Sequence, residues 1–373
     1  MSEPILFVCT SCGKAYPPNG NDWRCACGQP FELSAWPDFD PDRLDDTRPG
    51  LWRYRRMLPV ESSWKPISLG EGATQLLPAE WDGREILLKL ESMSPTGCFK
   101  DRGASVLATA LHGLGVRHVV ENSSGNAGVS LAAYTARAGI ACDLCVPATV
   151  DGPKLGLMAA YGAEVIEIKG KREYAALAAW AAAAHGAFYA SHVYNPFFMA
   201  GTETVAYELW EQLERRAPAG VVLPVGNGTL LLGVYRGFRR LQQAGLVDRL
   251  PRLLAVQSAA CAPIYEAFVE KRQTIAPIEA CPTITSCLAI CQPTWGEQIL
   301  AAVRDTGGAV LAVSDKETLS AHRHLARRGL YVEDSSAVAV AALSHLPRLG
   351  QAAADKPLVV IVTGHGLKTY RAQ

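Results

Sequence analysis

The sequence predicts an α/β protein with two doubly wound, mostly parallel sheets. From about residue 86 onward, short β-branched runs alternate with longer segments rich in alanine and leucine. Strands that alternate with helices belong to a parallel sheet whose two faces are covered by those helices. The pattern gives ten candidate strands, which is more than one sheet comfortably holds, so two sheets are expected.

Each expected element follows from the length and composition of its segment. Runs of four to six mostly apolar residues predict strands at 86–90, 118–121, 141–146, 164–168, 187–190, 221–225, 253–257, 309–313, 330–333 and 358–363. Segments of eleven to fourteen residues predict helices over 101–112, 127–137, 174–184, 202–215, 230–243 and 316–328. These lengths separate buried strands from helices where periodicity alone does not.

Composition excludes several classes of function. The 373 residues carry 36 Lys and Arg against 36 Asp and Glu, so the chain lacks the basic excess that nucleic acid or an anionic membrane requires. No apolar run reaches the ~18 residues of a membrane span, and the start at Met1 has no positively charged signal region. The 11 cysteines are odd in number, which argues against a disulfide framework and favours a cytoplasmic protein.

Ligands of parallel sheets bind at the carboxyl ends of strands and at helix N-termini, which makes three strand-to-helix turns the candidate functional segments. The first turn runs from Ser94 to Gly103 and places Lys100 where a helix begins. Backbone N–H groups and the positive helix end disfavour a charged ammonium there. They favour the nucleophilic amine that a Schiff-base lysine needs. The alternative is a solvated lysine at an ordinary helix start.

The second turn, Asn122 to Gly128, follows an expected strand directly. Its small residues and two glycines let a backbone approach a ligand closely, and Asn126 can both donate and accept hydrogen bonds. An ordinary capped turn is the alternative.

The third turn runs from Pro224 to Leu230, between an expected strand and an expected helix. Consecutive N–H groups at a helix N-terminus form a cradle that suits a phosphate. The turn lacks the full dinucleotide-binding fingerprint, because position 231 is leucine.

Together the turns resemble the pyridoxal-phosphate (PLP) enzymes of the tryptophan synthase β-subunit fold, and the threonine synthase family in particular. The matching stretches are Leu69-Gly-Glu-Gly-Ala-Thr74, Pro95-Thr-Gly-Cys-Phe-Lys-Asp-Arg-Gly103, Ser123-Ser-Gly-Asn126, Asn195-Pro196 and Thr363-Gly-His-Gly366. The resemblance implies a zinc-ribbon-like module at 1–33, a large PLP-binding domain of 34–105 and 196–373, and a small domain at 106–195. It also implies a homodimer.

The resemblance implies a role for each site residue. Lys100 would form the Schiff base with PLP and then move protons at the substrate Cα. Asn126 would bond the ring hydroxyl of PLP, and Thr363 would meet the pyridine nitrogen and leave it unprotonated, which suits elimination and replacement more than transamination. The cofactor phosphate would be held by Gly226, Asn227, Gly228 and Thr229. The substrate would be contacted by Thr74, Ser123, Ser124, Ala127 and Phe198.

Four cysteines near the N-terminus form a candidate zinc site. Cys9 and Cys12 have the C-x-x-C-G spacing of a zinc knuckle, whereas Cys25 and Cys27 are one residue closer together than a second knuckle. Four thiolates can complete one tetrahedral Zn²⁺ site. The alternative is a degenerate ribbon that folds without metal. Many threonine synthases have a similar ribbon. Sequence does not assign roles to Cys98, Cys287 and Cys291.

The chain departs from the threonine synthase pattern where that family holds its substrate phosphate. Ala127 stands where threonine is usual, Phe198 where arginine is expected, Glu203 where lysine is usual and Gln75 where proline is usual. Replacing a bidentate anion partner with an aromatic ring changes what a pocket prefers.

These observations predict a PLP-dependent, threonine-synthase-like lyase that catalyses elimination or replacement on a small amino acid. One alternative is a true threonine synthase, which converts O-phosphohomoserine to threonine and phosphate, with a rearranged phosphate site. Others are a β-replacement synthase, a serine, threonine or cysteine ammonia-lyase, and a non-catalytic PLP-binding paralogue. Retention of Lys100, Asn126, the phosphate loop and Thr363 argues against the last.

Overall fold

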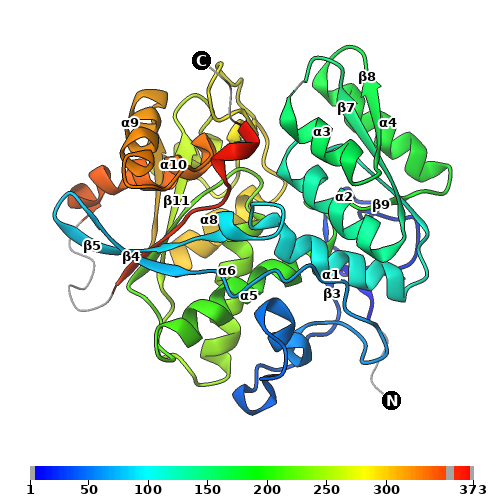
Figure 1. Ribbon diagram of the computed structural model, residues 1–373, viewed down its shortest axis with the longest axis horizontal. Helices are drawn as coiled ribbons and strands as arrows, with labels where there is room; N and C mark the ends of the chain where they lie inside the picture. Colours follow the sequence, from blue (N-terminus) through cyan, green and yellow to red (C-terminus); the bar gives the residue numbers. More distant parts are fainter. Residues whose placement is uncertain (1–4, 151, 350–356, 370–373) are drawn as a thin grey trace. The chain divides into compact units, whose positions relative to one another are not determined.

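The computed structural model describes residues 5–150, 152–349 and 357–369. The chain divides into two compact units, which we call unit 1 (Met1–Gly72 and Lys100–Thr202) and unit 2 (Ala73–Phe99 and Glu203–Gln373). Unit 1 holds a wholly parallel four-stranded sheet, and unit 2 holds a six-stranded sheet that is mostly parallel (Figure 1). These two sheets confirm the predicted α/β fold.

In this division residues 34–72, 100–105 and 196–202 belong with unit 1, whereas the resemblance implies that they belong to the large domain. For the segment 34–72, the buried carboxylate of Glu71 gives a physical reason. It accepts hydrogen bonds from the Trp52 indole at 2.9 Å, the Ser105 hydroxyl at 2.6 Å and the Tyr134 hydroxyl at 2.7 Å. Hydrogen bonds to a buried charged group are among the stronger ones in proteins, so this carboxylate fixes the segment to the helices that carry Ser105 and Tyr134.

The four-stranded sheet of unit 1 is wholly parallel and has the order β8-β7-β6-β9. Its elements are α1 (Lys100–Gly113), β6 (His118–Glu121), α2 (Asn126–Ala138), β7 (Ala141–Pro147), α3 (Pro153–Ala160), β8 (Glu164–Ile168), α4 (Arg172–Ala184) and β9 (Phe188–Tyr189). Alternate residues of a strand face opposite sides. Val119 therefore packs in the core with α1 and α2, whereas Val120 packs with α4. Both faces are covered in this way.

The N-terminal module is part of unit 1. Its three antiparallel strands are β1 (Phe7–Cys9), β2 (Ala15–Tyr16) and β3 (Phe31–Leu33), in the order β2-β1-β3. Phe7 stacks on Phe31 and lies 5.7 Å, between ring centroids, from Phe197. Aromatic pairs at this separation contribute beyond their buried area, so the module is docked to the unit by its own core residues.

Unit 2 holds a six-stranded sheet with the order β12-β11-β10-β13-β5-β4. Its strands are β4 (Leu76–Trp81), β5 (Arg84–Lys89), β10 (Gly220–Pro224), β11 (Arg252–Ser258), β12 (Ala309–Val313) and β13 (Leu358–Ile361). Its helices are α6 (Thr229–Gln243), α7 (Pro263–Val269), α8 (Gly296–Asp305), α9 (Asp315–Ala326) and α10 (Asp334–Ala341). Only β4 is antiparallel to its neighbour.

Helix α5 (Pro196–Gln212) begins in unit 1 and ends in unit 2. Short 3₁₀ segments are found at Pro41–Arg43, Gly50–Met57, Glu91–Met93, Ser286–Leu288, Ala342–Leu349 and Gly366–Thr369. Among the described residues, none of the helices combines the length and apolar character needed to cross a bilayer.

Most predicted elements are present, with three kinds of difference. The strand predicted at 330–333 is wrong, because Val332 makes only an isolated bridge to His365. Strand β4 was not predicted, since Pro78 disfavours a strand except at a sheet edge, where β4 lies. Helices α3, α7, α8 and α10 were not predicted either. They have seven to ten residues, too few to separate from loops by periodicity.

A buried ion pair lies in unit 2 at the end of strand β5. The Lys89 ammonium is completely buried and forms an ion pair with Glu208. It also donates to the Thr74 carbonyl at 2.8 Å and to the Gln212 side chain at 2.8 Å. These contacts therefore balance the positive charge of Lys89 and give its ammonium hydrogen-bond acceptors.

Lys89→Met should lower the free energy of unfolding by about 3–5 kcal/mol, because it leaves Glu208 buried without its cation. Urea unfolding followed by circular dichroism measures this change. Lys65→Met, at an exposed lysine, is the matched control and should change stability by less than ~0.5 kcal/mol. Equal stability of the two variants would contradict the buried pair.

Candidate active site

The predicted site residues fall in both units. In unit 2, strands β10, β13 and β5 are neighbours and run parallel. The carboxyl ends of parallel neighbours lie at one edge of a sheet, which is where such sheets bind ligands. The loop that follows β10, the Thr363 segment that follows β13 and the turn that follows β5 therefore share that edge.

The loop after β10 has the features of a phosphate site. Gly228 caps α6 with φ 86° and without a side-chain hydrogen bond, so the first N–H groups of this fifteen-residue helix are presented by backbone alone. A Cβ atom at Gly228 would lie 2.2 Å from Ile299 Cδ1, and one at Gly226 would lie 3.3 Å from Ile290 Cγ1. Glycine is therefore required at 228 for both the conformation and the space, whereas a Cβ atom at 226 would make only a tight contact. The helix N-terminus favours an anion.

Thr363 lies just after β13 and belongs to a hydroxyl pair. Its Oγ1 atom is 2.9 Å from Ser336 Oγ, which accepts a hydrogen bond from the Gly364 N–H at 2.7 Å. The Ser336 hydroxyl can donate either to the Gly364 carbonyl oxygen, at 3.1 Å, or to Thr363. When it donates to Thr363, the Thr363 proton can be given to an acceptor such as an unprotonated ring nitrogen. The Phe99 N–H donates to the Thr363 carbonyl at 3.1 Å, which fixes the residue just before Lys100.

Two of the cysteines without assigned roles also lie near these loops of unit 2. Cys98 is completely buried and forms an isolated backbone bridge with Gly364. The carbonyl oxygen of Cys287 would lie 3.5 Å from a Cβ atom at Gly226. Both therefore shape the backbone around the candidate phosphate and ring-nitrogen sites.

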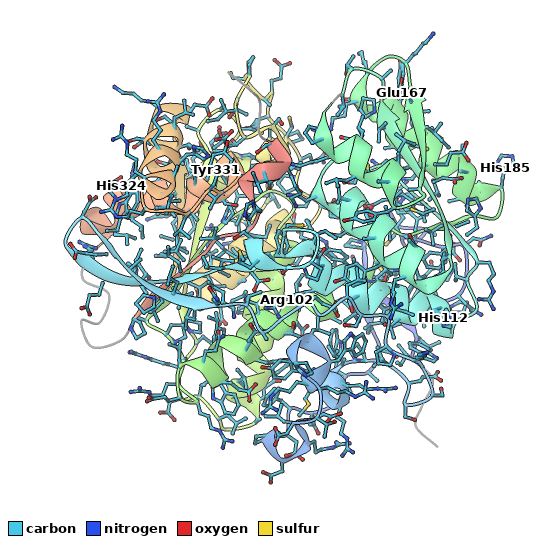
Figure 2. All side chains as sticks on the ribbon, in the orientation of Figure 1. Arg102, His112, Glu167, His185, His324 and Tyr331 are labelled. Atoms are coloured by element: carbon cyan, nitrogen blue, oxygen red, sulfur yellow. The ribbon has the colours of Figure 1, made fainter. Side chains whose placement is uncertain are left out.

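In unit 1, Lys100 begins helix α1 as predicted, and its ammonium lies over the ring of Phe198. The ammonium lies 5.4 Å from the centroid of the Phe198 ring, and that ring is 2% exposed. A Cβ atom at Gly103 would lie 2.5 Å from the ring, so helix α1 accommodates Phe198 only because residue 103 is glycine. Arg102, labelled in Figure 2, is completely buried in the same helix.

The second predicted turn closes against its own backbone in unit 1. A Cβ atom at Gly128 would lie 2.1 Å from the Ser123 carbonyl oxygen, which explains the glycine at this position. Ser123, Ser124 and Asn126 are half-buried, and Ala127 is buried at the start of α2. The hydroxyl and amide groups can therefore reach a ligand, whereas Ala127 supplies no donor.

Two residues, the predicted substrate residue Thr74 and the charged residue Glu203, make structural contacts within unit 2. The Thr74 hydroxyl in unit 2 donates to Glu91 at 2.7 Å, so its substrate role stays a prediction. Glu203 accepts a hydrogen bond from the Tyr207 hydroxyl at 3.2 Å and lies 3.7 Å from Arg240 Nε. The charge of Glu203 is therefore balanced within unit 2.

A histidine–carboxylate pair in unit 1 was not predicted from the sequence; its Glu121 is buried, and the His192 side chain is 21% exposed. The Glu121 carboxylate accepts from the His192 backbone N–H at 3.1 Å and makes a short contact with Nδ1 of the same residue. Burial lowers the pKa of His192 and the positive charge of Lys100 adds to this effect, while Glu121 acts in the opposite direction. Strand order could have indicated this pair, because Glu121 ends β6 and His192 follows the neighbouring parallel strand β9.

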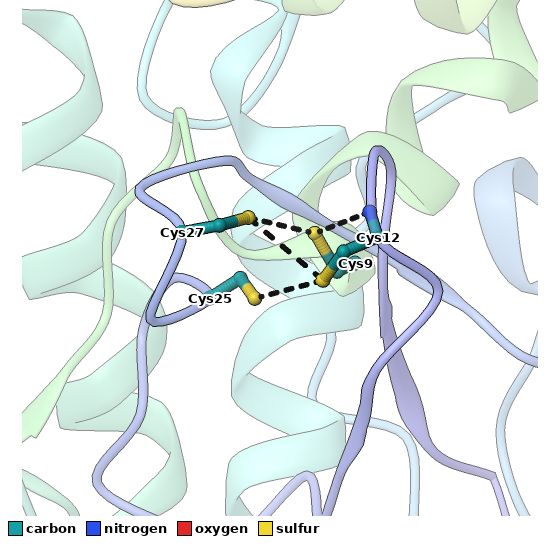
Figure 3. Close-up of side chains that lie close together, drawn as sticks. All are labelled: Cys9, Cys12, Cys25 and Cys27. Atoms are coloured by element: carbon teal, nitrogen blue, oxygen red, sulfur yellow. Dashed lines mark hydrogen bonds between the residues drawn. The ribbon is translucent and has the colours of Figure 1, made fainter.

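The four N-terminal cysteines converge on one point (Figure 3). All four Sγ atoms lie within 4.8 Å of one another, with 3.4 Å between Cys9 and Cys27 and 3.5 Å between Cys12 and Cys25. Zn–S bonds of about 2.3 Å place the sulfurs of a tetrahedron about 3.8 Å apart. The closely spaced Cys25 and Cys27 thus both reach the cluster. A hydrogen bond from the Tyr16 hydroxyl lowers the pKa of Cys25 to about 6, which favours a thiolate.

Comparison with known proteins agrees with this architecture. Residues 67–364 match the family described as pyridoxal-phosphate dependent enzyme. The chain is 36% identical to a threonine synthase of Methanocaldococcus jannaschii over 98% of this chain and 93% of that one. It is 35% identical to a threonine synthase of Methanosarcina acetivorans over 88% and 83% of the two chains.

Solved structures show the same fold. A threonine deaminase of the organism abbreviated T.th. is 26% identical and has a TM-score of 0.66, with 80% of this chain and 94% of that chain covered. A fungal L-serine ammonia-lyase from Rhizomucor miehei is 24% identical, with a TM-score of 0.65 and coverage of 79% and 93%.

The fold and the match define a PLP-dependent lyase. Within that class, the chain belongs to the threonine synthase family.

Proposed function

We propose that this enzyme catalyses elimination or replacement on a small amino acid that carries no phosphate. The observation that carries the proposal is Phe198. Its ring is buried in unit 1 beneath the Lys100 ammonium, at the position where the family pattern has an arginine. Arginine binds phosphate through two parallel hydrogen bonds, and neither Phe198 nor Ala127 can replace them. An aromatic face suits a small or uncharged substrate group better.

The residues present fit the PLP cofactor. Lys100 would bind its aldehyde, Asn126 its ring hydroxyl, Thr363 its ring nitrogen, and the loop of Gly226, Asn227, Gly228 and Thr229 its phosphate. When bound, PLP supplies an electron sink for a carbanion at Cα. The support in this chain is the glycine-dependent cradle at the start of α6 and the hydroxyl of Thr363, which has a proton to donate when Ser336 is the donor of their pair.

Side chains of the protein would determine which reaction follows at the substrate Cα. Lys100 would hold and move the proton of the substrate Cα, because its amine is placed at a helix start. Ser123 and Ser124 would orient the substrate through their hydroxyl groups. The Thr363 hydroxyl would keep the ring nitrogen unprotonated, which favours elimination and replacement.

A second candidate is threonine synthase itself, with a rearranged phosphate site. The curated threonine synthases that match over most of this chain favour it. The proposals of a homodimer and of a cytoplasmic location apply equally to both candidates.

The attachment of the cofactor tests the proposed function. Borohydride reduction of the PLP-loaded protein, followed by peptide mapping, should place the pyridoxyl group on Lys100, because its amine is expected to be nucleophilic. Lys100→Met should bind PLP without a reducible bond. Labelling of Lys89 or Lys368 instead would overturn the assignment.

O-phosphohomoserine should be a poor substrate. Charge-assisted hydrogen bonds contribute about 1.5–3 kcal/mol each, so the loss of two should lower kcat/KM by roughly 10²–10⁴ relative to an enzyme that has them. Phe198→Arg combined with Ala127→Thr should raise whatever activity the wild type has, measured as phosphate release. Efficient threonine formation by the wild type would instead support the second candidate.

We also propose that the cysteine cluster binds one structural zinc ion. The support is the sulfur spacing and the four thiol ligands, which match a closed tetrahedral site. The ion would stabilise the N-terminal module, whose Phe7 packs against Phe197.

Purified protein should contain about one zinc per chain by mass spectrometry, since four thiolates complete one site. Cys25→Ser should release the ion and lower the stability of the module, while the PLP spectrum stays largely intact. Cys281→Ser, at an exposed cysteine of unit 2, is the control and should retain the zinc. Metal-free, fully folded protein from zinc-replete cells is the result expected of a ribbon that needs no metal.

A further inference from the structure

We propose that His192 is the general base that takes a proton from a protic second reactant, such as water or a thiol, and that Glu121 is its positioning residue. The inference rests on the proposed function, in which Lys100 acts at the substrate Cα. It adds that the reaction is a replacement, in which a second reactant attaches to the substrate after the first group leaves.

Glu121 fixes the orientation of His192 by contacting both its backbone N–H and its ring. Glu121 is 1% exposed at the end of β6, and one of its oxygens accepts from both the backbone N–H and the ring Nδ1 of His192. A ring whose Nδ1 donates to a carboxylate carries its lone pair on Nε2 when neutral. The Glu121 contact therefore sets the tautomer that can accept a proton.

The second oxygen of Glu121 is buried and has no hydrogen-bond partner in the described part of the chain. A buried carboxylate normally has its lone pairs satisfied, and an exception calls for an explanation. Here the excess negative charge would stabilise the imidazolium that forms when His192 takes up a proton, as the carboxylate of a catalytic triad does.

His192 and Lys100 border the same aromatic ring. The His192 ring meets the edge of Phe198, with centroids 5.9 Å apart and planes at 69°. The Lys100 ammonium lies 5.4 Å from the centroid of that ring. All three residues belong to unit 1. The positive charge of Lys100 is also one of the causes that lower the pKa of His192, so the two groups interact electrostatically.

The chemistry follows from these positions. The O–H or S–H bond of the second reactant breaks, its electron pair stays on oxygen or sulfur, and the proton forms an N–H bond at Nε2 of His192. The oxygen or sulfur then has the electron pair with which to bond the substrate carbon. Burial lowers the pKa of His192, which favours the neutral form that accepts a proton.

The test compares two proton movements in the PLP-loaded enzyme. Exchange of the substrate Cα proton in D₂O, followed by NMR, reports on Lys100. Replacement by 2-mercaptoethanol on L-serine and L-threonine reports on the second reactant. His192→Gln should lower the replacement rate by about 10²–10⁴, while Cα exchange stays within about threefold of wild type.

His185→Gln is the control, because His185 is exposed at the end of α4 (Figure 2). It should leave both rates unchanged. If His192→Gln lowers both rates equally or neither rate, the role of His192 is overturned while the proposed function stands. Absence of Cα exchange in the wild type with either amino acid would overturn the proposed function itself, and the role of His192 with it.

A second readout needs no turnover. The imidazole of His192 should titrate below its ordinary pKa of about 6.5 in ¹⁵N NMR of the full chain. Lys100→Met should move that pKa upward, because it removes a nearby positive charge, and Glu121→Gln should move it downward. A pKa that does not respond to Lys100→Met would show that the two residues do not share a site.

Discussion

The parallel pairing of β5, β13 and β10 is the constraint on which the catalytic part of unit 2 depends. Val360 pairs with Leu88 on one side and with Val222 on the other, so the three strands end at one edge of the sheet. That register brings together the turn before Lys100, the hydroxyl of Thr363 and the glycine loop before α6. A slip by one residue would reverse the faces of every side chain in a strand and would separate these groups.

Unit 1 depends on the fit of one aromatic ring. Phe198 is buried against Gly103 on one side, while Lys100 lies over its face and His192 meets its edge. The ring thus lies between two titratable groups. In the proposed function, Phe198 stands where the threonine synthase family pattern has an arginine. The proposed proton transfers of unit 1 would therefore depend on how a single apolar side chain packs.

Sequence predicted the parts of the site whose chemistry is local. The strand at 220–224 and the helix from Thr229 define the glycine loop, and both were predicted to within one residue. The edge strand β4 and the short helix α10 were not predicted, because tertiary packing rather than periodicity forms them. The pair of Glu121 and His192 was not predicted, because its members are 71 residues apart in the sequence. Only the order of β6 and β9 in the sheet brings them together.

The cofactor phosphate is proposed to lie on the N-terminus of α6, held by backbone N–H groups. Phosphorus NMR of the PLP-loaded protein tests it most directly. A phosphate monoester in water changes charge near pH 6, whereas one that is hydrogen-bonded to a helix N-terminus should remain a dianion. A phosphate held at this helix N-terminus should give a ³¹P chemical shift that does not change between about pH 5.5 and 8. A shift that titrates near pH 6, like that of free PLP, would contradict it.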